Sequence, residues 1–149
     1  MRDRRKAVNE HYDYQHLVTF GDTNAVGNVY FANYFRWQGE CREALMAEHF
    51  PEFAHYLRQG YGLVTEFAHV DYSQEARLFD RITVRMTLAD ISRTRMEFAF
   101  VFLRDDGTEL ARGRQAVIWT DDRRRPNLMP EELYESAARY FGVTEVGSM

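Results

Sequence analysis

One segment, residues 30–48, limits the folds open to this chain more than any other part of the sequence. Its large side chains recur at helical spacing along two stripes, one through Tyr30, Tyr34, Trp37 and Cys41 and the other through Phe31, Phe35, Gln38, Arg42 and Leu45. A helix that begins near Tyr30 would therefore be apolar around much of its circumference. Such a helix has to be covered on both sides, so the rest of the chain or a second copy must pack around it.

The segments on either side of this helix alternate between apolar and polar residues, which is typical of strands. We expect strands over 13–20, 62–73, 80–92, 93–107 and 108–121. Asp106-Gly107 supplies the positive φ angles of a tight hairpin between the last two. A short helix over 51–60 should end at Gly60, and a closing helix over 129–141 has Pro130 near its start. One long helix beside about five strands predicts an α+β fold, with an antiparallel sheet curled around the helix.

Length and composition narrow the class of protein. The 149 residues suffice for one domain, and we place it at 12–142, between a flexible basic tail at 1–11 and a flexible tail at 143–149. The net charge of −4 gives no general signal for nucleic acid. Cys41, the one cysteine, fits a reducing compartment and a packed apolar role. No apolar run approaches the ~20 residues of a membrane span, so we expect a cytoplasmic protein without a membrane partner.

Several motifs carry a family resemblance. The stretch FGDTNAVGNVYFANYFRW (20–37), together with RLFDRITVRM, DDGTELARGRQAVIWTD and PNLMPEEL, resembles the 4-hydroxybenzoyl-CoA thioesterase family of hotdog-fold proteins. Two narrower stretches, GNVYFANYFRWQGECRE and YGLVTEF, are similar to the thioesterases associated with enediyne polyketide synthases. This resemblance implies a single hotdog domain that hydrolyses a β-keto polyketide thioester held on the acyl carrier protein domain of an iterative synthase. It also implies a homo-oligomer, a dimer of dimers, and a released β-keto acid that can lose carbon dioxide to give a polyene.

The chain departs from the wider family at Asn24, where that family has its catalytic carboxylate. An amide is neither a base nor a nucleophile, but the enediyne group resembles this chain in having it. Asn24 and Arg42 match the functional positions of that group, and the amide that polarises the carbonyl in the wider family would belong by position to Phe31. Gly27 would let the backbone approach closely, and Tyr34 and Thr65 would be polar lining. Oriented donors of this kind contribute about 3 to 4 kcal/mol to a transition state. We expect no cofactor beyond the phosphopantetheine of the substrate, and no metal.

Other readings of these residues stay open. Asn24 could simply stabilise a loop, and Arg42 could pair with Glu40 or Glu43 or contact a second copy. Glu40, Glu43 and Glu66 are the carboxylates that could restore a general base, although we expect structural roles for them. We interpret the basic run at 2–6 as a solvated tail. The run Arg123–Arg125 is either a solvated loop or a contact for the phosphopantetheine phosphate or an acidic carrier protein. The alternatives for function are a general acyl-CoA thioesterase and a non-catalytic acyl-binding hotdog protein.

Overall fold

The computed structural model describes residues 10–25 and 27–143 of the chain. Within these residues the elements follow the order β1 (Tyr12–Leu17), α1 (Asn33–His49), α2 (Glu52–Arg58), β2 (Gly62–Tyr72), β3 (Arg81–Ile91), β4 (Arg95–Arg104), β5 (Glu109–Thr120) and α3 (Glu131–Tyr140), with a 3-10 turn over Phe20–Asp22. Most of the two predicted tails, 1–11 and 143–149, lies outside the described residues.

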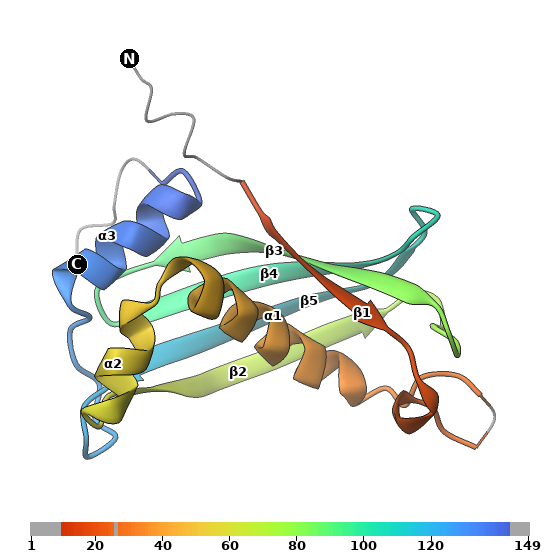
Figure 1. Cartoon of the computed structure of the whole chain (residues 1–149), viewed down its shortest axis with the longest axis horizontal. Helices are drawn as coiled ribbons and strands as arrows, with labels where there is room; N and C mark the ends of the chain where they lie inside the picture. Colours follow the sequence, from red (N-terminus) through yellow and green to blue (C-terminus); the bar gives the residue numbers. More distant parts are fainter. Residues whose placement is uncertain (1–9, 26, 144–149) are drawn as a thin grey trace.

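The strands form one antiparallel sheet in the order β1-β3-β4-β5-β2, and α1 lies across one face of it (Figure 1). This leaves β1 and β2 as the edge strands. The alternation of β4 explains the attachment of the helix, because Phe98, Phe100 and Phe102 all point into the core. Trp37, Cys41 and Leu45 of α1 are fully buried against them. The predicted α+β hotdog arrangement is confirmed.

The predicted turns are also present. Gly107 has a φ of +90°, and its N–H donates to the Arg104 carbonyl at 2.9 Å, which closes the hairpin between β4 and β5. Gly60 has a φ of +101° just after α2, and Pro130 is the N-cap of α3. No helix among residues 10–25 and 27–143 is long and apolar enough to cross a membrane.

Two predicted boundaries next to the candidate site are wrong, and both errors lie around the 3-10 turn. The first strand ends at Leu17 and not at Phe20, whose side chain is 74% exposed. The central helix begins at Asn33 and not near Tyr30. The late start of the helix is explained by Asp22, which lies between β1 and α1. Its main-chain carbonyl accepts hydrogen bonds from the Tyr30 N–H at 2.9 Å and from Asn33 Nδ2 at 2.8 Å, so the chain is held in a turn until Asn33.

Candidate functional site

The first part of the candidate site is the loop between the 3-10 turn and α1. Thr23 and Val29 form an isolated antiparallel bridge that closes the loop. Inside it, the Asn24 N–H donates to the Asn28 carbonyl at 2.9 Å, and the Gly27 N–H donates to the Asn24 carbonyl at 3.1 Å. The main chain of Asn24 is thus fixed on both sides, while the residue itself is exposed.

Gly27 is required by its backbone conformation, with a φ of +90°. A Cβ at this position would meet no atom within 4 Å among the described residues. The structure therefore gives a reason for the glycine, the turn itself, that differs from the close approach we expected from the sequence.

A buried carboxylate that sequence reasoning missed anchors this loop. Asp22 Oδ2 accepts from the Thr19 N–H at 3.0 Å and lies 2.8 Å from His16 Nε2. Its Oδ1 accepts from Arg36 Nη2 of α1 at 2.8 Å. Burial raises the pKa of Asp22, but the Thr19 amide, His16 and Arg36 outweigh burial and lower the pKa below its ordinary value. Asp22 is ionised at neutral pH and joins the end of β1 to α1.

Phe31 precedes α1 by two residues, so its amide does not belong to the first turn of the helix. Its carbonyl accepts from the Tyr72 hydroxyl at 2.8 Å and from the Tyr34 N–H at 3.3 Å. Among the described residues, no acceptor receives the Phe31 N–H. The side chain is 57% exposed. The amide is therefore available to a ligand near the positive end of the α1 dipole.

Tyr34 lies in the first turn of α1 and is buried. Burial raises the pKa of Tyr34 to about 12, and a hydrogen bond from the Ala76 backbone opposes part of that rise. The hydroxyl is thus protonated at neutral pH. Tyr34, Phe31 and Tyr72 line a small cavity of about 240 Å³ at this end of the molecule.

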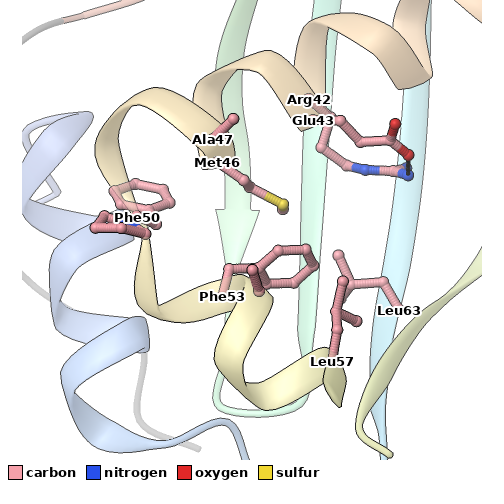
Figure 2. Close-up of a pocket in the computed structure, with 10 residues that line it drawn as sticks. Arg42, Glu43, Met46, Ala47, Phe50, Phe53, Leu57 and Leu63 are labelled. Carbon is pink, nitrogen blue, oxygen red and sulfur yellow. Dashed lines mark hydrogen bonds and ion pairs between the residues drawn. The ribbon is translucent and has the colours of Figure 1, made fainter.

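Arg42 is the second part of the candidate site, and it lies in the middle of α1. Its Nη1 donates to Gln115 Oε1 of β5 at 2.6 Å. Its Nη2 donates to Glu43 Oε2 at 3.2 Å, the contact dashed in Figure 2. Its Nε is buried and has no hydrogen-bond partner among the described residues. The side chain is 12% exposed, as its place in the apolar stripe predicted. Burial lowers the pKa of Arg42 and Glu43 partly opposes this, but an arginine starts so high that it stays charged.

Beside Arg42 is a cavity of about 660 Å³ between α1, α2 and β2. Figure 2 shows Arg42 and Glu43 together on one side of it and the side chains of Phe50, Phe53 and Leu57 across from them. Apart from Arg42 and Glu43 the lining is apolar: Met46, Ala47, Phe50, Pro51, Phe53, Ala54, Leu57 and Leu63. The site thus combines one charged end with hydrocarbon walls.

Thr65 lies on the edge strand β2, opposite Val117. It is exposed and stands directly before an irregularity between Thr65 and Phe67. Leu63, two residues earlier on the same strand, lines the cavity beside Arg42. Thr65 is therefore close along the strand to the Arg42 part of the site.

The predicted site residues fall into two groups in one chain. Asn24, Gly27, Phe31 and Tyr34 lie before and at the first turn of α1, and Arg42 and Thr65 lie farther along the helix and on β2. Eight residues of helix separate Tyr34 from Arg42, which is about 12 Å at 1.5 Å per residue. One chain does not bring the two groups together.

The three carboxylates that could have restored a general base all have partners. Glu40 accepts from Tyr14 Oη at 3.0 Å and from Arg36 Nη1 at 3.2 Å. Glu66 pairs with Arg95 at 2.7 Å, and Glu43 pairs with Arg42. Among residues 10–25 and 27–143, no group of three His, Cys, Asp or Glu side chains is arranged to hold a metal ion.

Comparison with known proteins assigns the chain to a family. Residues 18–136 match the model of the thioesterase-like superfamily, so the chain belongs to that superfamily and is a thioester hydrolase. Among solved structures it is similar to the dynemicin thioesterase, whose crystal structures describe polyene binding. The two are 40% identical with a TM-score of 0.81, over 87% of this chain and 96% of that one.

Two curated relatives are more distant. A protein of Aquifex aeolicus (strain VF5) whose name places it among the esterases is 30% identical over 94 residues, which is 62% of this chain and 73% of that protein. The 1,4-dihydroxy-2-naphthoyl-CoA hydrolase of Synechococcus elongatus is 28% identical over 86 residues, 56% of this chain. That match spans 63% of the Synechococcus protein, less than two thirds of its length.

Proposed function

We propose that this chain hydrolyses the thioester between a β-keto polyene acyl chain and the phosphopantetheine of an acyl carrier protein, in the biosynthesis of an enediyne-type product. The observation that carries the proposal is Arg42, a largely buried cation at the charged end of an otherwise apolar cavity, with one N–H that has no partner among the described residues. A hydrocarbon chain with oxygen atoms at one end has the complementary chemistry. The similarity to the dynemicin thioesterase, at 40% identity, supports the same substrate class.

The reaction needs no ionisable base. The oxygen of a water molecule bonds to the thioester carbonyl carbon, the carbon–sulfur bond breaks, and a water proton ends on the pantetheine sulfur. The Phe31 N–H donates to the developing oxyanion, and the side-chain amide of Asn24 orients the water. The Arg42 guanidinium stabilises negative charge or holds the β-keto oxygen. Tyr34 and Thr65 line the path of the substrate.

Two copies are required to assemble this site, because one chain keeps the Asn24 and Arg42 groups about 12 Å apart along the helix. β2 is an edge strand of eleven residues, and its outer side pairs with no other strand among the described residues. Pairing of β2 with β2 of a second copy places two α1 helices side by side. The Asn24 group of one copy then faces the Arg42 group of the other, in a dimer that pairs again to form a tetramer.

The carrier protein is the proposed partner of an exposed basic turn. Arg123, Arg124 and Arg125 follow β5, and the backbone N–H groups of Arg123 and Arg125 both donate to Asp121 Oδ1. The neighbouring Asp122 lies against Gly60 at the end of α2, so this turn is near the helix that borders the cavity. Acidic carrier proteins and their phosphate group complement such a turn.

The test compares one acyl group on two carriers. We expect kcat/KM to be higher for the acyl group on a carrier protein than for the same group on coenzyme A. A clear preference for coenzyme A would contradict the carrier-protein substrate and assign the chain to acyl-CoA hydrolysis, the activity named for the Synechococcus relative.

A further inference from the structure

The two walls of the cavity beside Arg42 differ in how deeply their residues are buried. One wall is made by Met46 of α1 and by Phe50, which directly follows the helix, and both are buried members of the hydrophobic core. The opposite wall is α2, which contributes Phe53, Ala54 and Leu57. No residue of α2 is buried, and Leu57 is 44% exposed. One side of the cavity is therefore made by a seven-residue helix with little packing of its own.

α2 is held in place largely through Tyr56 and Gly60, which do not line the cavity. The Tyr56 hydroxyl donates to Glu132 Oε2 of α3 at 2.8 Å, and the Tyr56 ring meets Trp119 edge-on with centroids 6.0 Å apart. Gly60, with its positive φ, fits against Asp122. Of the three side chains that α2 turns toward the cavity, Phe53 also helps to hold the helix, because its ring lies 6.3 Å from that of Trp119. The exposed Ala54 and Leu57 can change without loss of these contacts.

Building on the proposed function, we infer that α2 sets the length of acyl chain that the enzyme accepts. Among the described residues that line the cavity, the charged ones are Arg42 and Glu43, so the oxygen-bearing end of the substrate belongs there. The hydrocarbon then extends over Met46 towards Phe53, Ala54 and Leu57. A cavity of about 660 Å³ is of the size that encloses a ligand, about 300–1,000 Å³. The occupant is an extended, unbranched saturated or polyene chain.

The first test fills the cavity. Ala54→Phe adds a ring to its wall, at an exposed position where the fold tolerates a larger side chain. We expect kcat/KM for long straight-chain acyl-pantetheine thioesters to fall about tenfold or more, with short-chain thioesters hydrolysed at the wild-type rate. His55→Phe is the matched control, because it places the same side chain on the same helix at a residue that does not line the cavity. It should leave the whole chain-length profile unchanged.

The second test opens the cavity. Leu57→Ala removes an apolar side chain from the α2 wall and should move the preferred substrate to a longer chain. If Ala54→Phe and Leu57→Ala both hydrolyse every chain length as the wild type does, α2 does not set the length, although the proposed function stands. If the wild-type protein hydrolyses none of the acyl-pantetheine thioesters, the proposed function itself fails, and the role of α2 fails with it.

Discussion

The Arg42 side chain combines a permanent charge, an exposure of only 12% and an N–H without a partner among the described residues. A buried charge costs free energy unless it is paired, and here Gln115 and Glu43 supply only part of the pairing. The remaining donor, Nε, is buried without a partner among the described residues, on a side chain that borders the cavity. At the scale of single residues, this makes Arg42 the position at which a small chemical change should have a large effect on hydrolysis.

Replacement of Arg42 by Met keeps most of the side-chain volume and removes the charge. We expect kcat/KM to fall about 10²-fold or more, because loss of one oriented donor to a developing charge has that effect in other hydrolases. Arg42→Lys keeps a charge but lacks the planar guanidinium group, so its kcat/KM should lie between those of the wild type and Arg42→Met. Circular dichroism and thermal unfolding would show whether each variant is folded. A folded Arg42→Met protein with the wild-type rate would remove Arg42 from the mechanism.

The pH dependence of the rate follows from the same groups. Arg42 stays charged although burial lowers its pKa. Tyr34 has a pKa of about 12, and the pKa of Asp22 lies below its ordinary value. None of these groups changes its protonation between about pH 6 and pH 8. We therefore expect kcat/KM to vary little across that range when measured with a pantetheine thioester. A steep ionisation near neutral pH would indicate a titrating base that the proposed mechanism does not contain.

Asp22 makes a different prediction, about stability. Because its folded pKa is lowered, its contribution is fully present above about pH 4 and is lost as the pH falls through the folded value. Asp22→Asn should lower the free energy of unfolding at pH 7 by about 2 kcal/mol, since hydrogen bonds to a charged group are lost. Urea unfolding at neutral and at acid pH would measure this. The difference between variant and wild type should shrink in acid; an equal difference at both pH values would contradict the role given to this carboxylate.

At the scale of elements, α1 is fixed to the sheet by a contact that depends on a glycine. Gln38 is fully buried and its Nε2 donates to the His69 carbonyl of β2 at 3.3 Å. The amide passes over Gly113 of β5, where a Cβ would clash with Gln38 Nε2 and would lie 2.9 Å from the His69 oxygen. The glycine leaves room for a polar link between the long helix and the edge strand.

Gly113→Ala should therefore lower the free energy of unfolding by about 2 kcal/mol, the usual cost of overfilling a packed interior. Thermal or urea unfolding measures the change. The double variant Gly113→Ala with Gln38→Ala removes the first clash but not the second, so it should be closer to Gln38→Ala alone than additivity predicts. Full additivity of the two substitutions would show that Gln38 and Gly113 are not coupled.

The elements that were predictable from the sequence are those with a strong local pattern. Alternation identified the four later strands, and Asp106-Gly107 identified the hairpin. The start of α1 was not predictable, because it depends on the Asp22 carbonyl, which no local pattern of residues 30–32 reveals. The partners of Asp22 come from different parts of the chain: His16 from β1, Thr19 from just before the 3-10 turn and Arg36 from α1. In the sequence, only the aspartate of the DTN motif indicated this cluster. The cavity depends on how α2 packs, which periodicity does not describe.

At the scale of the whole molecule, the two separated groups of candidate residues make a prediction about mixed assemblies. Asn24→Ala and Arg42→Met should each be almost inactive alone. If each site takes Asn24 from one copy and Arg42 from another, unfolding and refolding the two variants together creates pairs with one intact site. Random pairing should then restore about a quarter of the wild-type activity. Recovery of no activity in folded mixed oligomers would place both residues in the same copy.

The two borders of the sheet differ in length, and this limits how the protein assembles. β2 has eleven residues and β1 has six. If two sheets join through β2, the long edge strand of each copy pairs with that of the other. The edge strands of the combined sheet are then the two short β1 strands. A short border is a poor template for adding further strands. If two copies pair through β2 as we propose, we expect the same asymmetry to stop further growth, so that assembly ends at a closed particle of fixed size where a sheet with two long edge strands would polymerise.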